Sequence, residues 1–266
     1  MEVGVDTSIR SLDDPTLLSP TLPIEEYMFS VSTYCLHTHP LPYALERLSE
    51  ITDMIELMDD GLHYISSSEI LESYSFDYSI HAPARGVNIA SLLEPIRRAS
   101  VEVIDDCFAI AAEVNADVII HPGYFAWVEE RGAAEEQFAR SLDEITEAAI
   151  DRGVTFSVEN MGNWDYFFLR TPDEIPLLQG APLTLDVGHA HLNACLPGFL
   201  KHSFVHIHIH DNDGTNDAHT AVGTGTIDFT EVCRAVNREG ITPVIEVQTL
   251  DGVLSSIEAL RPMLRG

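Results

Sequence analysis

Short apolar runs alternate with longer amphipathic stretches over most of this chain, and the alternation begins near residue 28. Eight runs have the length and the β-branched or aromatic content of strands: residues 28–34, 54–58, 78–81, 117–121, 154–159, 183–187, 204–210 and 243–247. The spacing between neighbouring runs leaves room for one helix and two loops. Eight such βα units predict the α/β class and, within it, a single (β/α)8 TIM barrel.

Helix signals lie between the predicted strands. Residues 91–115 and 133–152 carry apolar side chains at three- and four-residue spacing, as amphipathic helices on a sheet do. Asp228 as the N-cap and Gly240 as the stop predict a helix over residues 229–239. An open doubly wound sheet is the alternative, but no G-x-G-x-x-G turn follows the first strand, so the barrel is favoured.

The beginning of the chain differs from the rest. Residues 1–26 hold Pro15, Pro20 and Pro23 among polar residues, which predicts an irregular arm. Residues 27–266 are then one barrel domain. A chain of 266 residues with 45% hydrophobic residues can bury one large core.

The charge balance restricts the partners. The chain has 14 Lys and Arg against 43 Asp and Glu, a formal net charge of −29. This argues against a broad nucleic-acid groove, because phosphate binding depends mainly on Lys and Arg, and leaves open only a small basic patch. Four cysteines without a C-x-x-C pair favour a reducing cytoplasm. No apolar run reaches the roughly 20 residues of a membrane helix, so we expect a soluble cytoplasmic protein without membrane association.

The seventh strand contains the most informative pattern. Alternate residues of a strand face opposite sides, so Val205, Ile207 and Ile209 share one face. The other face carries three histidines, at positions 206, 208 and 210. Because the apolar face must pack under helices, the histidines are expected to face the barrel interior. His206 lies deeper and is expected to be a core residue or to support residues nearer the rim.

Similar polar positions occur near the carboxyl ends of other strands, where barrel enzymes place their chemistry. Any single histidine is more often a hydrogen-bonded core residue, but the whole set indicates a metal site: His81, His121, Glu159, Asp186, His189, His208, Asp217, His219 and Glu246. Imidazole and carboxylate ligands suit Zn, Mn, Fe or Co. Nine groups exceed the needs of one ion and would serve two or three, with carboxylates bridging.

Three further residues are candidates for substrate contact. Glu56 shares a strand face with Met54 and Met58, and either projects into the pocket or pairs with an inward arginine. His210 is a candidate at the rim. Trp127 belongs to an aromatic loop that forms either a wall over a small substrate or packing against the rim.

In their order along the chain, these motifs resemble the xylose-isomerase-like TIM-barrel superfamily, which includes sugar and sugar-phosphate isomerases and epimerases together with endonuclease IV. The resemblance covers about residues 28–265, and HIHDND…DAH…GTGTIDF is its most specific part. For the sugar enzymes it implies one divalent ion held at Glu159, Asp186, His208 and Glu246. The two glutamates would then act as the acid/base pair that moves a proton beside a carbonyl through a metal-stabilised enediolate.

The endonuclease IV branch implies a different use of the same residues. All nine positions match it, and there they would hold three zinc ions for phosphodiester hydrolysis at abasic sites. The loops argue against DNA, since residues 82–86 carry one charge and no aromatic residue, and residues 123–130 are aromatic but acidic. We therefore predict a metal-dependent sugar or sugar-phosphate isomerase or epimerase with a small-molecule substrate. The alternatives are a trinuclear zinc phosphodiesterase and a catalytically silent binding barrel; a homo-oligomer is left open.

Overall fold

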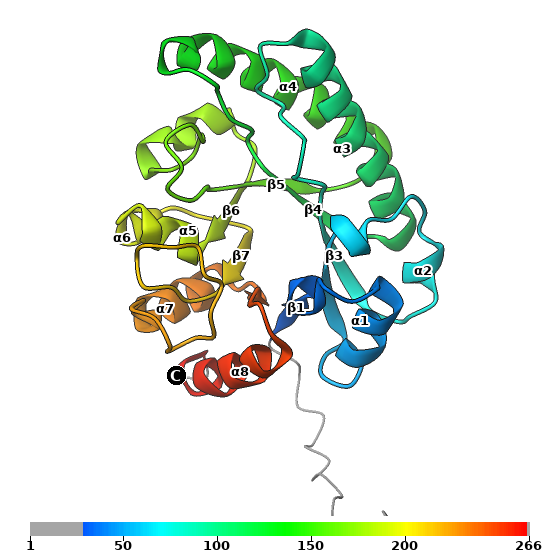
Figure 1. Ribbon diagram of the computed structural model, residues 1–266, viewed down its shortest axis with the longest axis vertical. Helices are drawn as coiled ribbons and strands as arrows, with labels where there is room; N and C mark the ends of the chain where they lie inside the picture. The colour runs from blue at the N-terminus through cyan, green and yellow to red at the C-terminus, as the bar shows by residue number, and fades with distance from the viewer. Residues whose placement is uncertain (1–28, 265–266) are drawn as a thin grey trace, which may run out of the picture.

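The computed structural model describes residues 29–264, and the predicted arm at residues 1–26 lies outside them. Within the described chain, eight parallel strands close into a barrel in sequence order (Figure 1). The strands are β1 Ser30–Ser32, β2 Met54–Met58, β3 Asp77–His81, β4 Asp117–Ile120, β5 Phe156–Glu159, β6 Leu183–Asp186, β7 His206–Ile209 and β8 Val244–Ile245. Each coincides with a predicted run to within two residues at either end. The prediction of a (β/α)8 TIM barrel is confirmed.

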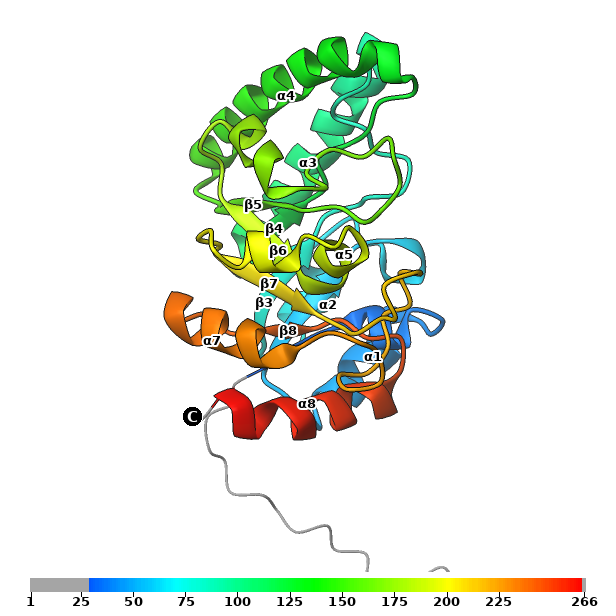
Figure 2. The same cartoon turned by 90° about the vertical axis from the view of Figure 1, so that its left-hand side faces the viewer.

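Helices surround the strands, as the side view in Figure 2 shows. The α-helices are α1 Leu41–Leu48, α2 Glu69–Glu72, α3 Glu94–Val114, α4 Arg131–Arg152, α5 Val187–Leu192, α6 Leu196–Phe199, α7 Phe229–Glu239 and α8 Leu250–Leu264. Short 3-10 helices are η1 Thr33–Leu36, η2 Gly61–His63, η3 Val128–Glu130 and η4 Pro172–Leu178. The bounds of α7 are those predicted, because the Asp228 side chain accepts a hydrogen bond from the Thr230 N–H and Gly240 ends the helix at φ +68°.

The core between sheet and helices is built by the outward-facing strand residues. Ile207 and Ile209 are fully buried there, as the strand pattern predicted. Val205 was expected with them, but 55% of its surface is exposed. The reason is that β7 begins only at His206, so Val205 precedes the strand and lies at the amino-terminal face of the barrel.

Strand register sets the height of the polar side chains. Asp186 pairs with His208 on the neighbouring strand, and Glu159 pairs with Thr184. His81 ends β3 and Glu246 follows β8 directly. Because all strands are parallel, these residues meet at the carboxyl-terminal end of the barrel. Among the described residues, none of the helices has the length and apolar character needed to cross a membrane.

Candidate metal centre

The nine side chains predicted as ligands gather at the carboxyl-terminal end of the barrel in three adjoining groups. Each group has nitrogen and carboxylate oxygen atoms within 4.8 Å of one another: His81, His121 and Glu159; Glu159, Asp186, His208 and Glu246; His189, Asp217 and His219. Strand ends supply most of the first two groups. Helix α5 and the loop after β7 supply the third.

Glu159 belongs to two of these groups. Its Oε2 lies 3.2 Å from Nε2 of His81 and 2.9 Å from Nε2 of His121, and the two imidazole nitrogens are 3.1 Å apart. Its Oε1 lies 2.9 Å from Nδ1 of His208. One carboxylate therefore faces two ligand groups, which is the arrangement of a bridging ligand in a multinuclear site.

The second group, which we call the primary group, is the most deeply buried. Nδ1 of His208 lies 3.7 Å from Oδ2 of Asp186 and 3.5 Å from Oε2 of Glu246. All four of its residues are at most 3% exposed. Three carboxylates this close in a buried site require cationic partners, and one imidazole alone supplies at most a single positive charge.

The third group is centred on Asp217. Oδ2 of Asp217 lies 3.1 Å from Nε2 of His189 and 3.3 Å from Nε2 of His219. His219 adopts φ +41°, a left-handed conformation that is uncommon outside glycine. An antiparallel bridge between Asp211 and Thr220 closes the loop that carries Asp217 and His219, and this closure holds the strained residue in place.

Three of the histidines have their orientation fixed by backbone carbonyl groups. Nδ1–H of His81 donates to the Ala82 carbonyl at 3.0 Å, and that of His189 donates to the Asn160 carbonyl at 3.0 Å. Nδ1–H of His219 donates to the carbonyl of Glu246 at 2.9 Å. A carbonyl can only accept, so Nδ1 carries the proton and the Nε2 lone pair of a neutral ring points into the ligand group. Metal-binding histidines use this arrangement.

Electrostatic coupling among these groups is strong. Burial by itself would raise the pKa of Glu159, but the charge of His208 and hydrogen bonds from His121, His208 and His81 hold it well below its usual value. Burial would lower the pKa of His189, yet Asp186 and Asp217 raise it well above the ordinary value. The site thus favours ionised carboxylates beside cationic groups. Its mixed nitrogen and oxygen donors fit a divalent ion such as Zn, Mn, Fe or Co.

Two polar side chains support the ligands from behind. Asn160 accepts from the backbone N–H of Asp186 at 2.8 Å and donates to its carbonyl at 3.0 Å, so it fixes the end of β6. Asp211 accepts from four backbone N–H groups, those of Asn212, Gly223, Gly225 and Ile227. The turn at residues 223–227 therefore encloses the carboxylate of Asp211.

The three predicted substrate contacts occupy different surroundings. Glu56 is fully buried beneath the primary group and pairs with His206 and His208, so two histidines stand where an arginine partner was the alternative. His210 is also fully buried. Its Nε2–H donates to Asp186 at 3.1 Å, and its ring stacks on His219 with centroids 3.8 Å apart. Trp127, in the loop between β4 and α4, is 65% exposed.

Tyr34 is a further residue at this end of the barrel, and it was not among the residues predicted from the sequence. Its ring centroid lies 5.0 Å from that of His219. Burial and the charge of Glu246 raise the pKa of its phenol, so the hydroxyl remains a hydrogen-bond donor near neutral pH. The sequence signal that could have identified Tyr34 as a site residue was its position at the carboxyl end of the first predicted strand.

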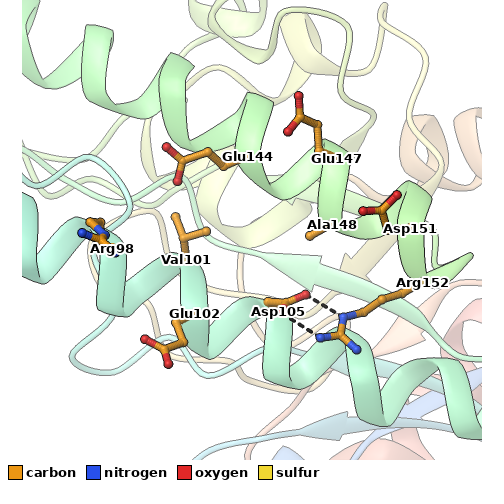
Figure 3. Close-up of a pocket in the computed structure, with 9 residues that line it drawn as sticks. All are labelled: Arg98, Val101, Glu102, Asp105, Glu144, Glu147, Ala148, Asp151 and Arg152. Carbon is orange, nitrogen blue, oxygen red and sulfur yellow. Dashed lines mark hydrogen bonds and ion pairs between the residues drawn. The ribbon is translucent and has the colours of Figure 1, made fainter.

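A surface cavity of about 670 Å³ lies between α3 and α4 (Figure 3), and none of the nine predicted ligands lines it. It is open to solvent and mostly acidic, and Arg152 within it pairs with Asp105 at 2.6 Å. Its lining includes no histidine and no deeply buried carboxylate. This cavity therefore lacks the mixed histidine and carboxylate donors that gather at the carboxyl-terminal end of the barrel.

The fold and the site together define the class of this protein. It is a (β/α)8 barrel in which histidines and carboxylates gather at the carboxyl-terminal end. The chain belongs to the xylose isomerase-like TIM barrel family, whose model matches residues 49–263. An uncharacterized protein of Methanocaldococcus jannaschii is 34% identical, and the match covers 84% of this chain and 92% of that protein.

Solved structures agree with this assignment. The structure of a D-tagatose 3-epimerase-like protein is 29% identical with a TM-score of 0.82, covering 89% of this chain and 97% of that one. The structure of an L-ribulose 3-epimerase is 18% identical with a TM-score of 0.71. The match covers 89% of this chain and 94% of that one, and it shows that the two proteins share the fold. The family membership predicted from the motifs is confirmed.

Proposed function

We propose that this protein is a divalent-metal-dependent sugar or sugar-phosphate isomerase or epimerase. The observation that carries the proposal is the primary group, in which Glu159 at the end of β5 and Glu246 just after β8 meet one aspartate and one histidine in a buried site. The epimerase names of structurally similar proteins support the same reaction class. The primary group would hold one ion, and the two flanking groups provide for up to three.

The two glutamates are unequally engaged. Glu159 faces His81, His121 and His208 at 2.9 to 3.2 Å. The carboxylate of Glu246 has looser neighbours, since Oε2 lies 3.5 Å from Nδ1 of His208 and 3.8 Å from Nδ1 of His219. A base must be free to take up a proton. We therefore assign proton abstraction from the carbon beside the carbonyl to Glu246, and return of a proton to Glu159.

The bound ion would polarise the substrate carbonyl and stabilise the negative charge that develops on its oxygen. The protein's own contribution is the placing of groups around the substrate. The ring of Tyr34 lies against that of His219, and the charge of Glu246 raises the pKa of its phenol. Its hydroxyl is therefore positioned to donate a hydrogen bond to a sugar oxygen. The positive charge of Arg85 acts in the opposite direction and lowers the pKa of the same phenol. Arg85 would supply a cationic group for a phosphorylated substrate.

A second candidate function is the trinuclear zinc phosphodiesterase. The specific observation in its favour is that the two flanking groups are complete, with all nine ligands in place. The charge of −29 and the acidic loop at residues 123–130 disfavour a DNA backbone at the barrel mouth. The isomerase or epimerase therefore stands first.

The deciding experiment follows carbon-bound hydrogen. Protein loaded in turn with Mn, Co, Fe and Zn is incubated in D2O with ketoses and ketose phosphates, and proton NMR records deuterium uptake beside the carbonyl. We expect uptake for one substrate, loss of uptake with a chelator, and none with Glu246→Gln. No exchange with any member, together with metal-dependent incision of a duplex containing an abasic site, would replace this proposal by the phosphodiesterase.

A further inference from the structure

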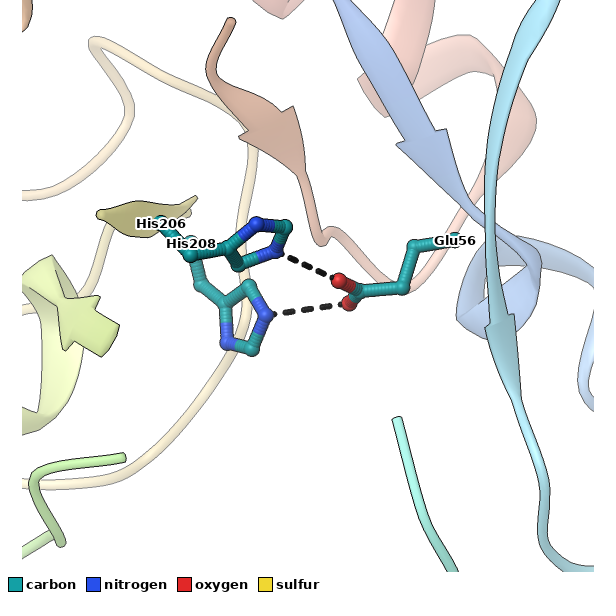
Figure 4. Close-up of side chains that lie close together, drawn as sticks. All are labelled: Glu56, His206 and His208. Carbon is teal, nitrogen blue, oxygen red and sulfur yellow. Dashed lines mark hydrogen bonds and ion pairs between the residues drawn. The ribbon is translucent and has the colours of Figure 1, made fainter. Parts of the chain in front are cut away.

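A buried carboxylate lies directly beneath the primary group. Glu56 projects inward from β2 and meets His206 and His208, which project inward from β7 (Figure 4). Oε2 of Glu56 is 2.7 Å from Nε2 of His206, and Oε1 is 3.0 Å from Nε2 of His208. Ser79 on β3 donates its hydroxyl to Oε2 at 3.2 Å. Glu56 thus accepts hydrogen bonds from His206 and Ser79 through Oε2, and its Oε1 lies at ion-pair distance from His208 in the middle of the barrel.

No Lys or Arg side chain pairs with this carboxylate among the described residues. A buried carboxylate remains ionised only when hydrogen bonds and nearby positive charge compensate its loss of hydration. The imidazoles of His206 and His208 and the hydroxyl of Ser79 are the groups placed to compensate Glu56. An ionised carboxylate only accepts hydrogen bonds, so each histidine nitrogen that faces it carries a proton.

His208 therefore has two different sides. Its Nε2 faces Glu56, and its Nδ1 faces the carboxylates of Glu159 and Glu246 in the primary group. A neutral imidazole has one proton, and if Nε2 holds it, the lone pair of Nδ1 is free for a metal ion. The ring is fully buried, so neither nitrogen is exposed to bulk solvent.

His208 also differs from three other histidines of the site. The nitrogens of His81, His189 and His219 that face away from the ligand groups donate to neutral backbone carbonyls. His208 instead faces a carboxylate. A negatively charged partner makes the opposite ring nitrogen a stronger ligand, and loss of such a partner typically weakens metal binding about 10- to 100-fold.

We propose that Glu56 is a positioning residue that holds the proton of His208 on Nε2 and thereby makes the primary group the tightest and first-filled metal site of this protein. The inference rests on the metal dependence proposed above and adds an order of loading to it. Glu56 acts through His208 and does not touch substrate.

The same three side chains allow a competing arrangement, in which an ion lies between Glu56, His206 and His208 themselves. That ion would need the Nε2 lone pairs of both histidines, so His208 would have to lose its last proton or leave the primary group. The two arrangements differ in the role of His206. It would be a ligand in the competing case, whereas in ours it only donates a hydrogen bond to Glu56.

The test is a titration of the metal-free full-length protein with Zn2+ in competition with a chromophoric chelator. We expect Glu56→Gln to weaken the tightest binding step about 10- to 100-fold and to leave the weaker steps within about twofold. Ser79→Ala, which removes another donor to Glu56 without altering His208, is the matched control and should leave every step within about twofold. His206→Gln should leave the number of bound ions unchanged.

NMR of the zinc-loaded wild-type protein labelled with 15N-histidine gives a second measurement that needs no variant. We expect His208 to carry its proton on Nε2 with zinc at Nδ1. A proton on Nδ1, an unchanged first step in a folded Glu56→Gln variant, or one ion fewer in His206→Gln would each overturn the inference. Absence of zinc binding by the wild type would instead overturn the proposed metal dependence, so the two failures are distinguishable.

Discussion

The backbone of Gly188 lies against the imidazole of His210, and a Cβ at this glycine would overlap the ring. The contact decides where His210 can lie. In that position the ring donates from Nε2 to Asp186 at 3.1 Å and stacks on His219. Because Gly188 has no side chain, His210 can lie against Asp186 of the primary group and His219 of the third group.

Replacing Gly188 by Ala should disturb this arrangement. Because the added methyl group has no room, His210 must move away from Asp186 or α5 must shift. We expect about 1 to 3 kcal/mol lower unfolding free energy and weaker Zn2+ binding, measured by urea denaturation and chelator competition. Gly132→Ala, at a position where a Cβ meets nothing within 4 Å, is the control. A Gly188→Ala variant with wild-type metal affinity would contradict the role given to the contact.

Glu246→Gln tests the proposed base. Gln cannot accept the substrate proton, so turnover of an identified substrate should fall about 10²- to 10⁴-fold. Circular dichroism should stay unchanged, because Glu246 follows the short strand β8 and an isosteric amide fits the same space. Glu102→Gln on the exposed surface of α3 should keep full activity. Retained turnover in a folded Glu246→Gln variant would remove this residue from catalysis.

His121→Ala separates the two metal stoichiometries. The side chain belongs to the first group only, so its loss should lower the number of bound ions by at most one and leave the primary group filled. If the reaction uses the primary group alone, turnover should change less than about tenfold, as kinetics and elemental analysis would show. His202→Ala, at an exposed position, is the control. Complete loss of activity on removal of His121 would favour the multinuclear mechanism.

The metal-free protein should lose stability at high pH. The surroundings of His81 and His219 raise both pKa values to about 9. Burial would lower them, but the hydrogen bonds that the protonated rings donate to Glu159 and Asp217, respectively, and nearby carboxylate charges outweigh it. A raised pKa in the folded state stabilises it below the unfolded value near 6.5, and that contribution disappears as the pH rises through about 9.

Urea unfolding of chelator-treated protein between pH 6 and 10 measures this loss directly. Zinc affinity should show the opposite trend over the same range and become tighter with pH, because ligand histidines must release their protons before they bind. Unfolding free energy that stays flat from pH 6.5 to 9.5 in the metal-free protein would contradict the prediction.

Asp211→Asn tests the turn after β7. The amide group must face two of the four backbone N–H groups that the carboxylate now accepts from, which leaves buried donors unpaired. We expect a loss of about 2 to 3 kcal/mol in unfolding free energy and faster hydrogen exchange at Gly223 and Gly225. Asp213→Asn on the exposed part of the same loop should cost less than about 1 kcal/mol. Equal effects of the two substitutions would contradict this account.

Strand positions and the inward direction of polar side chains were readable from the sequence because both depend on local periodicity. Alternation in β7 separates His208 from Ile207 and Ile209 wherever the strand lies. Val205 shows the limit of that reasoning. The apolar alternation continues to Val205, but this residue precedes β7, whose pairing with β6 begins at His206. Strand ends depend on neighbouring strands, and these are distant in sequence.

Residue types alone determined which chemistry can occur: histidines and carboxylates at the ends of successive parallel strands. Only the tertiary structure decided how they combine, with Glu159 facing two groups and Glu56 beneath His208. The physical reason is distance along the chain. The hydrogen bonds that select a histidine tautomer or share a carboxylate join strands far apart in sequence, and closure of the barrel alone brings their atoms within reach.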